Sequence, residues 1–150
     1  MDADWAGDKI DRNSTSGYVF MLGDSSIAWS SRKQATVAMS STEAEYVAAS
    51  HACKELLWLR QLLQDMNVFM GDPTIVYEDN QGCIRLVESD HCCARTKHID
   101  VCHHQLHDMQ EKGIIRVEYC PTENMIVDIL TKRLDKETFG KLVKQLGFKC

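Results

Sequence analysis

The stretch "AMSSTEAEYVAAS", residues Ala38–Ser50, places two glutamates two positions apart where a long helix should begin. Thr42 and Glu45 fit the capping-box pattern, in which the hydroxyl and the carboxylate each accept a hydrogen bond from a free backbone N–H group. The alternative is that Glu45 faces inward at the start of the helix and holds a cation. The surrounding sequence has to decide between these two roles.

The residues after this stretch predict a helix with one face in the core. Apolar side chains recur there at spacings of three and four: Ala44, Ala48, Ala52, Leu56, Leu59 and Leu63. This periodicity is typical of an amphipathic helix packed on a sheet. Gly71 and Pro73 lie beyond the last of these side chains, so the helix should end before them.

The rest of the chain predicts strands first, and then strands alternating with helices. β-branched and aromatic runs indicate a hairpin and two later strands, at residues 17–22, 27–31, 74–78 and 114–119. Helical patterns cover residues 80–89, 96–112, 122–134 and 135–148, and Asp135 is a candidate N-cap. We therefore expect one α/β domain over residues 1–150, with a mixed sheet flanked by helices.

Composition excludes several classes of protein. The 150 residues carry a net charge of −5, which argues against a free-standing nucleic-acid binder but not against an enzyme with a carboxylate site. The chain lacks an apolar run of about 18 residues, so we expect no membrane span. The acidic N-terminus does not resemble a signal peptide, and seven cysteines suggest no disulfide framework. These features favour a cytoplasmic or nuclear location.

Four acids lie at the ends of predicted elements, next to apolar residues: Asp2, Glu45, Asp79 and Asp128. Buried charges are costly unless they are paired or bind a metal, and carboxylates suit Mg²⁺ or Mn²⁺. Each acid also has an ordinary alternative role. Asp2 could belong to a loose terminus, Glu45 to a capping box, Asp79 to a turn and Asp128 to the surface, so spacing alone leaves the metal site open.

Seven segments of the chain resemble, in order, the ribonuclease H domain of copia-type retrotransposon polyproteins. They are "DADWAGD", "RNSTSGYVFMLG", "IAWSSRKQATVAMSSTEAEYVAAS", "CKELLWLRQLL", "YEDNQGCIRL", "RTKHIDV" and "PTENMIVDILTK". The resemblance covers residues 2 to about 134, and residues 135–150 then form a C-terminal helix.

The resemblance implies a ribonuclease H-like fold with a five-stranded mixed sheet flanked by helices. It also implies that Asp2, Glu45, Asp79 and Asp128 are both the catalytic residues and the ligands of two Mg²⁺ ions, with Mn²⁺ as a substitute. The implied reaction is hydrolysis of the RNA strand of RNA–DNA hybrids, leaving a 5′-phosphate and a 3′-hydroxyl, with the reverse transcriptase domain of the parent polyprotein as a partner. Under this interpretation Glu45 is a ligand, Glu43 faces solvent, and Thr42 can still cap the helix.

Substrate contacts follow from the same resemblance. Selectivity for RNA requires contacts with 2′-hydroxyl groups in a shallow minor groove. Small polar side chains beside the acids are the candidates, namely Ser41, Thr42 and Gln81. Basic groups should hold the nucleic-acid backbone, and the family motif points to Arg95, Lys97 and His98.

Two departures from the family pattern qualify the predicted activity. The family's first strand begins several residues before its catalytic aspartate, whereas Met1 directly precedes Asp2 here, so we expect an N-terminally truncated first strand and weak cleavage. The histidine that cellular ribonucleases H carry shortly before the last acid is missing. The alternative function is therefore a truncated or co-opted fragment that keeps the fold and acts as a non-catalytic binding protein.

The segment 91–107 is unusually rich in histidine and cysteine, which raises a zinc hypothesis. A helix would bring His98 and Cys102 onto one face, with His91, Cys92 or Cys93 as further ligands. The paired short spacers of structural zinc sites are not present, so sequence drift at exposed positions is the favoured alternative.

Three of the remaining cysteines and two of the tryptophans lie in apolar stretches. We expect them to be packing residues of the core: Cys53, Cys83, Cys120, Trp29 and Trp58.

Overall fold

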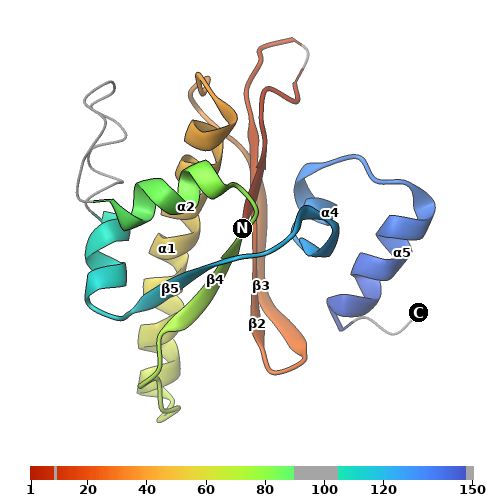
Figure 1. Ribbon diagram of the computed structural model, residues 1–150. Helices are drawn as coiled ribbons and strands as arrows, with labels where there is room; N and C mark the ends of the chain where they lie inside the picture. The colour runs from red at the N-terminus through yellow and green to blue at the C-terminus, as the bar shows by residue number, and fades with distance from the viewer. Residues whose placement is uncertain (9, 90–104, 148–150) are drawn as a thin grey trace.

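The computed structural model describes residues 1–8, 10–89 and 105–147. It confirms the α/β class, with helices on two sides of the strands (Figure 1). The predicted helix 96–112 falls largely outside the described residues, and within them residues 105–111 are helical.

The first three strands form an antiparallel sheet in the order β1-β2-β3. They are β1 (Asp2–Asp4), β2 (Thr15–Leu22) and β3 (Ser25–Lys33). Gly23 has a φ of 60°, which glycine adopts without strain and which lets β2 turn directly into β3. This is the predicted hairpin, and each of its strands is longer than predicted.

The last two strands form a separate parallel sheet. Strand β4 (Thr74–Glu78) pairs with β5 (Ile115–Tyr119). The predicted single five-stranded sheet is therefore divided into two. Strand β1 pairs with β2 along three residues, Asp2–Asp4, so most of β2 and β4 have no strand between them.

An apolar cavity of about 540 Å³ lies between β2 and β4. Tyr18 and Phe20 line it from β2, and Ile75 and Tyr77 line it from β4. The two sheets approach each other at one end of this cavity, where the Met1 ammonium group donates a hydrogen bond to the Tyr77 carbonyl oxygen at 3.1 Å. This contact places the start of β1 next to the end of β4.

Helices cover both sides of the strands (Figure 1). On one side lie α1 (Ser41–Asp65) and α2 (Gln81–Glu88), and on the other lie α4 (Asp128–Thr131) and α5 (Lys136–Gln145). The predicted helix 122–134 is broken into a short 3₁₀ helix, Thr122–Asn124, and α4. The break occurs because Met125 adopts an extended backbone and buries its side chain.

The start of α1 answers the question that its sequence raises. Ser40, not Thr42, is the N-cap, and its hydroxyl accepts a hydrogen bond from the Glu43 backbone N–H at 3.1 Å. Glu43 in turn accepts from the Met39 backbone N–H at 2.8 Å. The capping pair is thus shifted by two residues from the predicted one, and Glu43, which is half-buried, takes part in an exposed capping contact. Glu45 is released from capping and turns inward.

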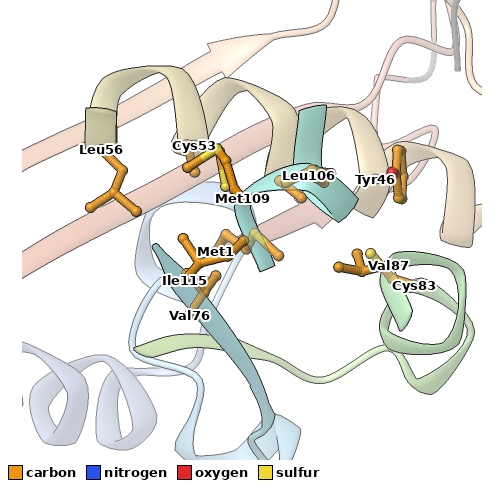
Figure 2. Packing of buried hydrophobic residues seen from close by; sticks show 12 residues of the cluster. Met1, Tyr46, Cys53, Leu56, Val76, Cys83, Val87, Leu106, Met109 and Ile115 are labelled. Atoms are coloured by element: carbon orange, nitrogen blue, oxygen red, sulfur yellow. The ribbon is translucent and has the colours of Figure 1, made fainter. Parts of the chain in front are cut away.

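The core lies between α1, the strands and residues 105–111. Figure 2 shows Leu56 of α1, Val76 of β4, Leu106 and Ile115 packed in one cluster with Met1. The predicted apolar stripe of α1 is buried except for Leu63, which is half-buried.

The prediction that two of the tryptophans pack in the core is wrong. Trp29 and Trp58 are 61% and 58% exposed, because Trp29 lies on the outer face of β3 and Trp58 lies off the buried stripe of α1. Cys53 and Cys83 are buried as predicted, whereas Cys120 is half-buried. Within the described ranges, no helix is both long and apolar enough to cross a membrane.

Helix α4 rests directly on β2 at Gly17. A Cβ atom added to Gly17 would lie 2.6 Å from Thr131 Cγ2 and 3.2 Å from Val127 Cγ2, closer than ordinary packing allows. The Ser31 hydroxyl, on β3, donates a hydrogen bond to the Leu130 carbonyl oxygen at 2.6 Å. The absence of a side chain at Gly17 therefore fixes how closely α4 approaches β1 and β2.

We predict that Gly17→Ala destabilises the fold by about 1–3 kcal/mol, the usual cost of overpacking. Thr131 is β-branched and its hydroxyl is bonded to Asp2, so it cannot rotate away freely. Gly140→Ala is the matched control, because nothing lies within 4 Å of the added Cβ on α5. That variant should be neutral or stabilising by about 0.4–1 kcal/mol. Urea denaturation measures both, and equal effects would contradict the packing argument.

Candidate metal site

Three carboxylates from distant parts of the chain meet at one place. Asp2, Glu45 and Asp79 each offer an oxygen atom, and these atoms all lie within 4.8 Å of one another. Asp2 and Glu45 are 0% and 5% exposed, and Asp79 is half-buried. Such a cluster is costly without a cation, because buried like charges repel and lack water.

Local structure explains how each of these acids reaches the site. Asp2 lies in β1 opposite Gly17, and Glu45 lies in the first turns of α1. Asp79 follows β4 directly, and its Oδ2 accepts a hydrogen bond from the Thr122 hydroxyl at 2.7 Å. The next residue, Asn80, caps α2 by accepting from the Cys83 backbone N–H.

The fourth predicted acid, Asp128, is connected to Asp2 by an ion pair of each carboxylate with the same lysine. The Lys132 ammonium group lies 2.8 Å from Asp2 Oδ1 and 2.9 Å from Asp128 Oδ1, and so bridges the two carboxylates. Asp128 and Lys132 are one helical turn apart, at the start and just past the end of α4. The Thr131 hydroxyl donates a hydrogen bond to the other oxygen of Asp2.

Burial and mutual repulsion dominate the electrostatics of the site. Burial, with smaller effects from Glu78, Asp2 and Asp79, raises the pKa of Glu45 to about 10. Burial also raises the pKa of Asp128, although the hydrogen bond from Lys132 opposes this. For Lys132, burial alone would lower the pKa, but the hydrogen bonds to Asp2 and Asp128 hold it above its usual value.

Glu78 is a further carboxylate near the site, and it is not among the four predicted acids. It is fully buried at the end of β4, and burial raises its pKa to about 7. Its Oε1 accepts a hydrogen bond from the Asn80 backbone N–H at 2.9 Å, while Oε2 has no hydrogen-bond partner among the described residues. Strand alternation could have predicted that Glu78 is buried, because residues two apart in a strand share a face and Val76 also points inward.

The residues of the site fit a divalent metal ion. The Glu45 Oε2 atom is buried and has no hydrogen-bond partner in the described part of the chain, so it has an unused acceptor. The cluster consists of carboxylate oxygens, the donors that Mg²⁺ and Mn²⁺ prefer. Asp2, Glu45 and Asp79 could hold one ion together, and Asp128 could share a second with Asp2.

The predicted substrate-binding residues fall into two groups. Ser41 and Gln81 are exposed at the first positions of α1 and α2, and Thr42 is half-buried between them. The Thr42 hydroxyl donates to Asn80 Oδ1 at 3.4 Å, which links the two helix starts beside the acids. This bond joins Thr42 to the residue that follows Asp79, and so connects the start of α1 with one of the clustered acids.

The second group consists of Arg95, Lys97 and His98, which lie outside the described residues, as does most of the histidine- and cysteine-rich segment 91–107. Within that segment His107 is described. Its Nδ1 atom lies 3.1 Å from the Val87 carbonyl oxygen, and its Nε2 atom lies 3.7 Å from Glu111.

Comparison with known proteins relates the chain to transposon polyproteins. Over 146 residues, 97% of its length, it is 38% identical to the retrovirus-related Pol polyprotein from transposon RE1 of Arabidopsis thaliana. Over 145 residues, also 97% of its length, it is 39% identical to the retrovirus-related Pol polyprotein from transposon TNT 1-94 of Nicotiana tabacum. The matched segments make up 10% and 11% of those polyproteins, so the chain spans about a tenth of their length.

A shorter similarity involves a different kind of protein. Over 58 residues the chain is 59% identical to secreted RxLR effector protein 161 of Plasmopara viticola, covering 39% of the chain and 41% of that protein. No family model and no solved structure matches the chain. Taken together, the similarities support a retrotransposon Pol polyprotein as the source of this chain.

The raised pKa of Glu45 predicts how stability depends on pH without metal. The pKa of Glu45 is about 10 in the folded protein and 4.5 as the ordinary value of a glutamate, so the folded protein binds this proton more tightly than the unfolded chain does. The stability that Glu45 contributes through this proton is therefore complete below pH 4.5 and is lost as the pH rises toward 10. We expect the free energy of unfolding to fall between about pH 5 and pH 8, by up to about 1.4 kcal/mol per pH unit from this group. Glu45→Gln should flatten the profile.

Denaturation in a chelator at several pH values measures this slope. Glu123→Gln is the control, because Glu123 is exposed in the short 3₁₀ helix. If the Glu45→Gln profile is as steep as that of the control, Glu45 is solvated and ionised in the folded protein.

Proposed function

We propose that this chain is a ribonuclease H domain of a retrotransposon polyprotein, which hydrolyses the RNA strand of RNA–DNA hybrids. The observation that carries the proposal is the convergence of Asp2, Glu45 and Asp79, which are separated by dozens of residues in sequence. Gathering acids in a buried site is costly, since each adds repulsion, and a bound cation would offset that cost. The similarity to Pol polyproteins supports the same proposal.

The reaction adds a water oxygen to phosphorus and breaks the bond from phosphorus to the 3′-oxygen. Two Mg²⁺ ions, when bound, would activate the water and neutralise charge on the leaving oxygen. In this proposal Asp2, Glu45, Asp79 and Asp128 bind and orient those ions. The burial of Asp2 and Glu45 excludes bulk water from one side of the site, which strengthens their interaction with a cation.

Substrate selection is assigned to the polar groups at the two helix starts. In this proposal Ser41, Thr42 and Gln81 contact 2′-hydroxyl groups of the RNA strand, since they lie in the first turns of the helices that begin near Glu45 and Asp79. Arg95, Lys97 and His98 are proposed to bind backbone phosphates. The reverse transcriptase domain of the parent polyprotein would supply the hybrid.

A second candidate function is binding without cleavage. One observation favours it: the Lys132 ammonium group pairs with both Asp2 and Asp128 and so compensates part of their charge. A chain that relied on this compensation could keep the fold and bind a partner without turnover.

We predict that Asp79→Asn abolishes the proposed activity while stabilising the metal-free protein. Removing one of several repelling carboxylates should raise the melting temperature in a chelator, and the further rise that Mg²⁺ gives the wild type should be lost. Cleavage of an RNA–DNA hybrid should fall by about a hundredfold or more, since metal ligands contribute several kcal/mol to such reactions.

Asp24→Asn provides the control, because Asp24 is exposed in the turn between β2 and β3. It should leave both the melting temperature and its response to Mg²⁺ unchanged. A wild-type protein that responds to Mg²⁺ but does not cleave the hybrid would favour the binding function. A protein indifferent to Mg²⁺ and to Asp79→Asn would refute the metal site itself.

A further inference from the structure

Lys132 divides the acids of the site into two unequal parts. Its ammonium group contacts one oxygen of Asp2 and one of Asp128, at 2.8 and 2.9 Å. Among the described residues neither Glu45 nor Asp79 forms an ion pair, although the Lys132 charge lowers the pKa of Glu45 from a distance, and Glu45 Oε2 has no hydrogen-bond partner there. One part of the site is therefore open to a cation, whereas the other already holds one.

The position of this ammonium group is built into the fold. Lys132 is the residue that ends α4, and its backbone N–H donates to the Asp128 carbonyl oxygen. Helix α4 is fixed against the sheet by the Ser31–Leu130 hydrogen bond and by the missing side chain of Gly17. The helix cannot shift readily, so the ammonium group is held between the two acids.

The lysine side chain is nevertheless able to leave. It is 30% exposed, in contrast to Asp2 and Asp128, whose side chains are 0% and 9% exposed. A lysine stem is flexible and its ammonium group is readily hydrated, so the group can move toward solvent or toward a phosphate while the acids stay in place.

We propose that Lys132 is an internal cation that keeps a second divalent ion out of the Asp2–Asp128 part of the site until a nucleic-acid phosphate draws the lysine away. The inference rests on the proposed function. A divalent ion and an ammonium group cannot share the same two carboxylate oxygens without strong repulsion. Metal loading is therefore ordered: the first ion binds Asp2, Glu45 and Asp79 in the free protein, and the second requires substrate.

Binding of Mn²⁺ to the free chain tests this inference without any cleavage. The electron paramagnetic resonance signal of unbound Mn²⁺ gives the number of ions held per chain. The wild type should bind one ion, whereas Lys132→Met should bind a second, at least about tenfold more tightly than the wild type does, because removing a close like charge is worth that much or more. Lys132→Arg keeps the charge and should restore binding of one ion.

Two further variants serve as controls. Lys132→Gln keeps a hydrogen-bond donor but no charge, and should behave like Lys132→Met if that variant folds poorly. Arg133→Met is the matched control, because Arg133 is the exposed neighbour and should leave the count at one.

The inference is overturned if the wild type already binds two ions, if the uncharged variants bind as the wild type does, or if Arg133→Met has the same effect. Its failure is distinct from that of the proposed function, because hybrid cleavage is assayed separately. A chain that never cleaves but gains a second Mn²⁺ in Lys132→Met would refute the activity and support the role of Lys132.

Discussion

Asp2 carries the charge around which this molecule is arranged. Its carboxylate is completely buried, and each of its oxygens is bonded to a residue at the end of α4, one to Thr131 and the other to Lys132. A buried carboxylate without such partners would cost several kcal/mol of stability, a substantial part of what a small domain has. The contact between α4 and β1 is thus an electrostatic requirement as well as a packing contact.

This requirement explains why residues near opposite ends of the chain lie together. Strand β1 brings Asp2 next to β2, and Gly17 on β2 leaves the space into which Thr131 fits. Sheet packing therefore sets the distance between Asp2 and the charged groups of α4. A small change in how α4 packs on β2 would shift both Asp128 and the Lys132 ammonium group relative to Asp2. The stability of the fold and the geometry of the site are therefore coupled.

The sequence was sufficient to predict elements whose pattern is local. The stripe of α1 and the strand at Thr74–Glu78 follow from periodicity, and Asp135 caps α5 as expected. Family resemblance predicts the four acids, and the structure brings three of them together directly and Asp128 through Lys132. Periodicity alone could not have found this convergence, because it depends on which strands and helices meet.

The features that were missed depend on tertiary contacts. The pairs Ser40–Glu43 and Thr42–Glu45 both fit the capping-box motif. The backbone of Ser40 is extended and that of Thr42 is helical, so Ser40 is the residue that caps α1. The sequence pattern does not single out Glu78, yet strand alternation turns its side chain into the core. Trp29 and Trp58 are apolar by composition but lie on faces that nothing in the described structure covers. The division into two sheets depends on how β1 sits between β2 and β4, which no local pattern encodes.

The shortness of α4 has a consequence for how this segment can change over evolutionary time. An acid and its counter-charge are carried by five consecutive residues, Asp128 to Lys132, and their contact depends on a spacing of four. Replacing Ile129 by another apolar residue preserves that spacing. Inserting or deleting one residue would instead rotate the lysine by about 100° around the helix axis and carry it away from both acids. Related sequences should therefore show substitutions in this segment but hardly any change in its length.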